Sequence, residues 1–394
     1  MKLTGLISVA LFRGLTALIA FALILLLMQY LNIGDFASFS FYYTCFTLCS
    51  VLPNIGVNNS VVLNNEDTTF INKAVNVRLY QILFSLFFAL VFFLAEIVDN
   101  LLIFACLAGI LSSFFDLQLS FKQASKDLKK FAYFMPVKTS IVFIVALITL
   151  TVSNNFIEDV FVNLSIVFFL LSIVWFYKKI NISIKDIKKN LMVYKSSRDI
   201  FIFEVLALLM ARAEVFILTF YNNKEVVIKQ DIANFWSSYN FILVISMLGT
   251  TLSSIMLPYM KESVGDYRKI NKISNLTFFL MVLLIFIVVV SSYVLGNYFL
   301  TQYSEIYKFI FFMGIGVCFS FMSNIDRMKI VSGVGSNNRA NIIVVTQFIL
   351  SIILNIILIY IFGIWGAIFT FVFIRAFAWF LMHCEVKNDT KHME

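Results

Sequence analysis

The sequence predicts an all-α polytopic membrane protein with about 12 transmembrane helices, arranged as two six-helix repeats around a central cavity. Three observations predict it. Of the 394 residues, 61% are hydrophobic and only 13% are charged, whereas a soluble domain is nearer half apolar and a quarter charged. Apolar runs long enough to cross a bilayer recur along the whole chain. The basic residues gather in alternate loops between these runs.

The apolar runs define the elements in order. Each run is about as long as, or longer than, the ~20 residues that a spanning helix needs. Runs such as "FFLMVLLIFIVVVSSYVL" lack the alternation of a β-barrel strand. The first run is too long for a cleavable signal and contains Arg13, so we expect it to be the first span. The predicted spans are 5–31, 36–63, 79–98, 101–120, 133–153, 160–177, 199–221, 232–260, 274–295, 305–325, 341–362 and 364–382.

The distribution of loop cations predicts the orientation. With the N-terminus inside, the inside loops hold 23 Lys and Arg residues, Arg78 among them, and the outside loops hold only Lys224, Lys229 and Lys308. This asymmetry is a strong positive-inside signal, so we expect both termini in the cytoplasm. The net charge of +8 is scattered over short loops, which argues against binding of nucleic acid. The five cysteines and two histidines show no metal or redox spacing, and no cofactor is expected.

The chain divides near its midpoint. The longest polar stretch, "YKKINISIKDIKKNLMVYKSSRD", has six spans before it and six after it. We therefore predict an N-terminal bundle over 1–177, a basic cytoplasmic linker over 178–198, and a C-terminal bundle with a short tail over 199–394. The second span of each half opens alike: Asp35, Ala37, Phe39 and Tyr43 match Asp231, Ala233, Phe235 and Tyr239 at a constant offset of 196. Parallel repeats of this kind are typical of transporters.

Charges inside the spans indicate where function lies. Arg13 lies about 15 Å into the first span and Arg212 about 20 Å into the seventh, too deep to reach the surface easily. Each forms an ion pair between helices or faces a water-filled cavity, and we favour the cavity. Glu214 is two residues from Arg212, so the two project about 200° apart and cannot pair along one face. Glu204 lies nearer the cytoplasmic side, and Arg375 lies at an intermediate depth in its span.

Other polar residues in the spans have simpler explanations. Lys138 and Asp116 lie closer to helix ends, and we expect them to extend toward the surface. Pro53 and Pro258 fall late in the second span of each half, where a kink is expected. Interhelical hydrogen bonding and a cavity wall explain two polar stripes equally well: Gln347, Ser351 and Asn355 in the eleventh span, and Asn54, Asn58 and Asn59 in the second.

Several stretches together resemble a known family. "MARAEVFIL", "DIANFWSSYNFILVISMLGTTLSSIMLPYM" and "NIILIYIFGIWGAIFTFVF", with the two-repeat pattern, are similar to the Wzx-type O-antigen flippases of the multidrug/oligosaccharidyl-lipid/polysaccharide (MOP) exporter superfamily. The most specific positions are Arg212 and Glu214, where the family usually has Arg-x-Asp, then Pro258, Gly363 and Gly366-Ala367. Glu for Asp retains the charge and lengthens the arm.

The resemblance implies a function. It implies translocation of an undecaprenyl-pyrophosphate-linked oligosaccharide repeat unit from the cytoplasmic to the periplasmic leaflet of the bacterial inner membrane, by alternating access. The expected binding residues are Arg13, Arg212, Arg375, Asn54, Asn58, Gln347 and Asn355. Glu214 or Glu204 would couple the cycle to H⁺ or Na⁺. The lipid-linked oligosaccharide and the bilayer are the expected partners, and a polysaccharide polymerase and a chain-length regulator are further candidates.

Two alternatives compete with the flippase. A multidrug exporter of the same superfamily would want an acidic cavity for cationic compounds, whereas the deep charge here is mostly cationic. A membrane-embedded polysaccharide polymerase or ligase would need a sizeable outside loop with catalytic basic residues. The longest polar stretch here is predicted to be cytoplasmic, so we expect the chain not to be an enzyme.

Overall fold

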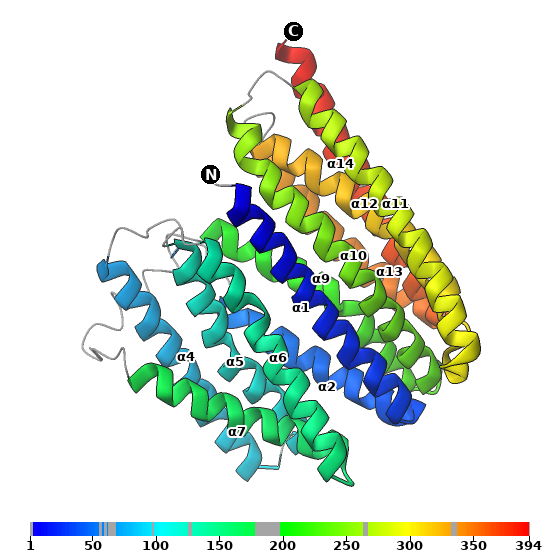
Figure 1. Ribbon diagram of the computed structural model, residues 1–394. Coiled ribbons are helices and arrows are strands. Elements are labelled where there is room, and N and C mark those ends of the chain that lie inside the picture. Colours follow the sequence, from blue (N-terminus) through cyan, green and yellow to red (C-terminus); the bar gives the residue numbers. More distant parts are fainter. Residues whose placement is uncertain are drawn as a thin grey trace. The chain divides into compact units, whose positions relative to one another are not determined.

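A computed structural model of the chain confirms the predicted fold class (Figure 1). It describes residues 3–54, 57–58, 61, 68–96, 98–124, 128–177, 198–262, 267–331 and 337–393. This part of the chain is α-helical, with two short 3₁₀ turns and no strand. The helices of the first half are α1 (Leu3–Tyr30), α2 (Ile33–Val51), α4 (Thr68–Leu94), α5 (Asn100–Ala124), α6 (Leu128–Val152) and α7 (Phe156–Tyr177). Those of the second are α9 (Arg198–Asn222), α10 (Lys229–Glu262), α11 (Tyr267–Tyr298), α12 (Ile306–Val331), α13 (Asn337–Phe362) and α14 (Ile364–Met393).

Ten of these helices are long and apolar enough to cross a membrane within the described ranges. In α9 and α10 many side chains lie outside the described residues, so the count does not extend to these two helices. Helix α9 has 25 residues, ample for a bilayer by length, and it carries Arg212 and Glu214.

Several helix ends differ from the predicted spans, and two of these differences bear on the site. The predicted second span runs to residue 63, but α2 ends at Val51 and the 3₁₀ turn η1 (Leu52–Asn54) follows. Pro53 lies in that turn, because proline lacks the N–H that would continue the helix. The third helix begins at Thr68, eleven residues before its predicted start, which places Arg78 within α4 rather than in a loop. Most of the predicted linker, 178–197, lies outside the described residues.

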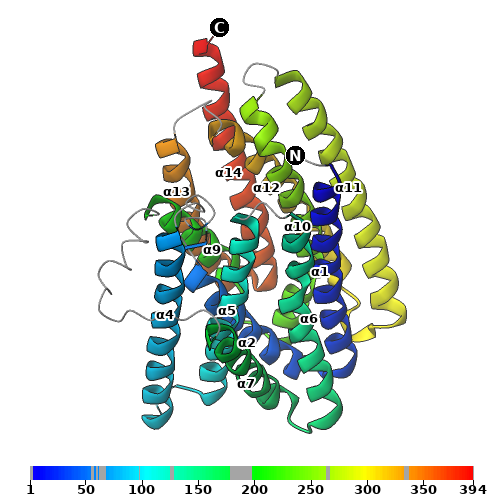
Figure 2. The same ribbon diagram turned by 60° about the vertical axis from the view of Figure 1, so that its left-hand side comes forward.

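The chain packs as two compact units. Unit 1 comprises Met1–Ala20 and Ser38–Arg212, and unit 2 comprises Phe21–Ala37 and Ala213–Glu394. In unit 1, α5 packs against α4, α6 and α7, and Figure 2 shows it between α4 and α6. Helices α2 and α5 approach closely at Gly109, where an added Cβ would stand 2.3 Å from the backbone oxygen of Phe46. Only glycine fits there.

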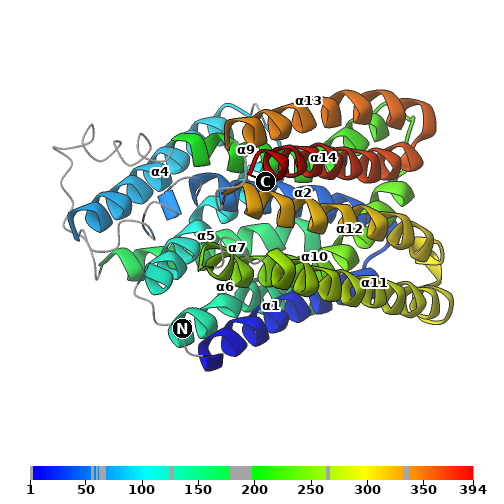
Figure 3. The ribbon, with the colours of Figure 1, turned by 90° about the horizontal axis from the view of Figure 1, so that it is seen from above.

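Unit 2 is built around α12, which packs against α10, α11, α13 and α14; Figure 3 shows it between α11 and α14. The unit includes the corner between α1 and α2. There the ring of Phe36 lies 5.3 Å from that of Trp236 and 5.7 Å from that of Tyr303. All three side chains are fully buried. The turn between α1 and α2, near the start of the sequence, therefore belongs to unit 2.

The two halves share local geometry at the offset predicted from the sequence. Helix α2 begins at Ile33 and α10 at Lys229, which is the same spacing of 196. In α2 the rings of Phe39 and Tyr43 stack at 5.4 Å, and in α10 the rings of Phe235 and Tyr239 stack at 6.5 Å. Repeated residues thus make repeated contacts.

Candidate substrate-binding site

Two of the deep cations belong to unit 1. Arg13 lies about ten residues into α1 and is half-buried. Its neighbour Phe12 packs edge-on against the ring of Tyr133 on α6, with 4.6 Å between centroids. Arg212 on α9 is also half-buried, and its positive charge acts on the hydroxyl of Tyr43 on α2. Both guanidinium groups are therefore set among helices, well inside the lengths that would span a membrane.

Glu214 has a different set of neighbours, in unit 2. Its side chain is buried, and its negative charge acts on the guanidinium of Arg375 on α14. Arg375 donates from Nη1 to the backbone oxygen of Phe371 at 2.8 Å, and its Cζ lies 3.2 Å from the centroid of that ring. Such stacking suits the weakly hydrated guanidinium plane. Arg212 and Glu214 thus act on separate partners, as their spacing on the helix requires.

A polar network in unit 1 connects four elements. The buried Arg78 donates from Nη2 to Oδ1 of Asn54 at 2.7 Å, and from Nη1 to Ser113 at 3.3 Å. The other end of the Asn54 amide donates from Nδ2 to Oδ2 of Asp116 at 2.8 Å. Lys138 on α6 donates to the same oxygen at 2.9 Å. The network runs from α4 through η1 and α5 to α6.

This network corrects two expectations from the sequence, one for Asp116 and Lys138 and one for Arg78. Asp116 and Lys138 do not extend separately toward the surface but pair with each other. Arg78 is fully buried rather than exposed in a loop. Asn54 and Asn58 make hydrogen bonds between elements, which is one of the two explanations offered for their stripe: Asn54 binds protein groups at both ends of its amide, and Asn58 accepts from Arg78 at 3.5 Å.

The stripe on α13 lies inside unit 2. Gln347, Ser351 and Asn355 are all buried. Asn355 donates from Nδ2 to the Ser351 hydroxyl at 3.4 Å, while its Oδ1 has no hydrogen-bond partner within the described residues. A buried acceptor without a donor costs stability. The remaining predicted side chains, Glu204, Asn59 and Pro258, lie outside those that the structure describes.

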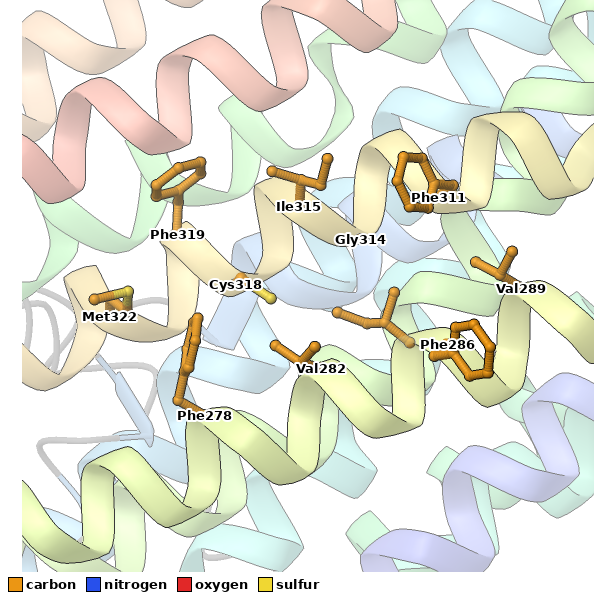
Figure 4. Close-up of a pocket in the computed structure, with 11 residues that line it drawn as sticks. Phe278, Val282, Phe286, Val289, Phe311, Gly314, Ile315, Cys318, Phe319 and Met322 are labelled. Atoms are coloured by element: carbon orange, nitrogen blue, oxygen red, sulfur yellow. The ribbon is translucent and has the colours of Figure 1, made fainter.

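The structure also contains two apolar pockets, one in each half of the chain. One, of about 330 Å³, lies between α11 and α12 and is lined by Phe, Val, Ile, Met and Cys side chains with Gly314 (Figure 4). The other, of about 320 Å³, lies between α4 and α5. Each therefore falls between the third and fourth described helices of its half. Their linings offer no charge, so a phosphate or sugar would bind elsewhere.

Comparison with known proteins identifies the architecture. No protein-family model matches the sequence, and no curated protein does. Among solved structures, the lipid II flippase MurJ in an inward closed conformation has a TM-score of 0.74 and 16% identity, over 97% of this chain and 87% of that one. The chain shares its fold with this flippase. An inward-facing multidrug resistance MATE transporter gives a TM-score of 0.64 at 10% identity, over 99% of both chains. An outward-facing one gives 0.57 at 11%, over 98% of this chain and 96% of that one.

Proposed function

We propose that this protein is a flippase for a lipid-linked oligosaccharide. It moves an undecaprenyl-pyrophosphate-linked repeat unit, of O-antigen or a similar glycan, from the cytoplasmic to the periplasmic leaflet by alternating access. The observation that carries the proposal is the placement of Arg13 and Arg212, half-buried and deep within helices of unit 1. The fold, shared with a lipid II flippase, is consistent with it.

The chemistry of the substrate explains why arginine is suited to this position. A pyrophosphate must leave water to cross hydrocarbon, and an unpaired anion is very costly there. Guanidinium groups replace the lost water with short, charge-assisted and often bidentate hydrogen bonds. Arg13 and Arg212 would take the pyrophosphate, and the polyprenyl tail would stay in lipid. Arg375, Asn54, Asn58, Gln347 and Asn355 complete the proposed set, with Asn54 acting through Arg78 and Asp116.

The proposal includes an energy source and a cellular setting. Glu214 and Glu204 are the proposed groups that take up H⁺ or Na⁺. Glu214 is suited to this because it is buried and its charge interacts with that of Arg375. The proposed location is the bacterial inner membrane, with both termini cytoplasmic and two six-helix bundles joined by a basic linker. A polymerase and a chain-length regulator would receive the translocated unit.

A multidrug exporter is the alternative that a specific observation favours, because two of the compared structures are multidrug transporters. Organic cations require acidic binding groups, whereas lipid pyrophosphates require basic ones. Among the described side chains well inside the helices, the cations Arg13, Arg78, Lys138, Arg212 and Arg375 outnumber the acids Asp116 and Glu214. That balance favours an anionic substrate.

Complementation tests the proposal. In cells lacking their own flippase and making the matching lipid-linked glycan, the wild-type chain should restore surface polysaccharide. Arg13→Ala and Arg212→Ala should each fail at normal protein levels, and Arg339→Ala, which removes a well-exposed surface guanidinium, should not. Restoration by both variants would refute the anion-binding role of these arginines. Resistance to cationic dyes in place of polysaccharide would favour the exporter.

A further inference from the structure

The ion pair between Lys138 and Asp116 has unused binding capacity on both partners. The Lys138 ammonium can donate three hydrogen bonds, yet Asp116 is its only partner within the described residues. About 20% of the Lys138 side chain and 30% of the Asp116 side chain are exposed. The pair is therefore accessible, although Lys138 lies about ten residues, or ~15 Å, along α6.

The carboxylate is held independently of the lysine. Oδ2 of Asp116 accepts from Nδ2 of Asn54 at 2.8 Å as well as from Lys138 at 2.9 Å. Arg78 occupies the opposite end of the same amide at 2.7 Å. A guanidinium can only donate, so the amide oxygen must face Arg78 and the NH₂ must face Asp116. If Lys138 moved away, Asp116 would keep this donor.

The net charge of this network favours an anion as its ligand. The network contains two cations, Arg78 and Lys138, and one carboxylate. Arg78 is fully buried and fixed on Asn54, so Lys138 is the cation that an external ligand can reach. A phosphate group carries more charge than a carboxylate and offers more acceptor oxygens, and lysine is a common point-charge ligand for it.

We propose that Lys138 is a phosphate-binding residue that exchanges between Asp116 and a pyrophosphate anion. Asp116 competes with the ligand for the ammonium, and Asn54 with Arg78 holds Asp116 in place during the exchange. This inference deepens the proposed function and rests on it. It adds a third anion-binding side chain of unit 1, on α6, to Arg13 on α1 and Arg212 on α9. The chemistry recognised is a pyrophosphate, on a lipid or free.

Competition predicts opposite effects from the two partners of one ion pair. Lys138→Gln should weaken binding of a pyrophosphate about tenfold or more, because a charge-assisted contact is lost. Asp116→Asn should tighten binding about two- to tenfold, because the ammonium is released from a part-buried pair. An ion pair that served stability alone would give no tightening. Lys138→Arg should retain most of the affinity.

The experiment uses the purified full-length chain in detergent. Geranylgeranyl pyrophosphate, inorganic pyrophosphate and neutral geranylgeraniol are titrated into wild type, Lys138→Gln, Lys138→Arg and Asp116→Asn. Lys329→Gln is the matched control, because Lys329 forms a similar part-buried pair with Asp326 at 3.0 Å in unit 2; its affinity should be unchanged. If the affinity for the prenyl pyrophosphate depends on Lys138, the site binds a lipid headgroup. If only the affinity for inorganic pyrophosphate depends on Lys138, that assignment is overturned.

Two further results would overturn the inference. The first is equal weakening, or no change, for Lys138→Gln and Asp116→Asn. The second is weakening by Lys329→Gln equal to that by Lys138→Gln. If Lys138→Gln does not give a monodisperse protein, the tightening by Asp116→Asn remains decisive. Loss of binding in Arg13→Ala and Arg212→Ala with no effect at Lys138 would leave the proposed flippase intact and remove only this site. Absence of binding by the wild type would remove both.

Discussion

The buried Glu214 on α9 and Arg375 on α14 carry opposite charges that attract each other within unit 2. Removing one of two interacting charges from a buried site is destabilising. Glu214→Gln should therefore lower the free energy of unfolding, and so should Arg375→Met. In a double-mutant cycle the two should be non-additive, with a coupling energy of about 1–3 kcal/mol.

This cycle needs a control, because Arg375 also packs on Phe371. Arg375→Lys keeps the charge but loses the planar stacking, so it should retain the coupling with Glu214 while losing some stability. Unfolding of the purified variants in detergent measures all of these terms. Strict additivity of Glu214→Gln and Arg375→Met would show that the two charges do not interact.

Arg78 should be the most sensitive arginine of unit 1 for stability. Its guanidinium is fully buried and satisfies Asn54 and Ser113. Replacement by Met would leave these groups short of a donor, and we expect a loss of about 3 kcal/mol in unfolding free energy. Arg339→Met is the comparison, because that side chain is 64% exposed beside Glu385 and should cost no more than about 1 kcal/mol. Equal losses would contradict the network.

The two glycines Gly109 and Gly14 should respond oppositely to alanine. A Cβ at Gly109 would stand 2.3 Å from a backbone oxygen, and one at Gly14 meets nothing within 4 Å. Gly109→Ala should force α2 and α5 apart and cost about 3 kcal/mol. Gly14→Ala should be neutral or stabilising by up to about 1 kcal/mol, because alanine favours the helix. Melting temperatures check both, and tolerance at Gly109 would argue against the close contact.

Replacing Asn355 by an apolar residue should increase stability but decrease transport. Its buried Oδ1 has no donor among the described residues, so Asn355→Leu should raise the free energy of unfolding by about 1–2 kcal/mol. Transport should fall, because Asn355 belongs to the proposed binding set. Thr370→Val is the opposite control: its hydroxyl donates to Gly366 at 2.9 Å, so its loss should destabilise. A fully active, stabilised Asn355→Leu protein would exclude Asn355 from the site.

Most of the fold can be predicted from the sequence because spanning helices are local. An apolar run of bilayer length determines a helix wherever it occurs, and the repeat at an offset of 196 is matched by the starts of α2 and α10. Helix ends are harder to predict. The end of α2 depends on Pro53, and α4 begins in the polar sequence at Thr68, where hydropathy carries no signal.

The contacts between charges cannot be predicted in the same way, because they depend on which helices are neighbours. Counting loop cations treats a residue near a helix end as outside the span, so it places Arg78 in a loop although the side chain is buried. Asp116 and Lys138 are 22 residues apart in sequence, and each alone is compatible with reaching the surface. By contrast, the separate partners of Arg212 and Glu214 follow from helical geometry alone.

Transport by the purified protein is the most direct test of the central claim that Arg13 and Arg212 carry a pyrophosphate-bearing lipid across the membrane. Proteoliposomes would hold a fluorescent polyprenyl-pyrophosphate-linked glycan, and its appearance in the outer leaflet would be followed by quenching. We expect the wild type to accelerate transfer, and the Arg13→Ala, Arg212→Ala double variant to transfer at the rate of empty vesicles. Transfer by the double variant at the wild-type rate would contradict the account.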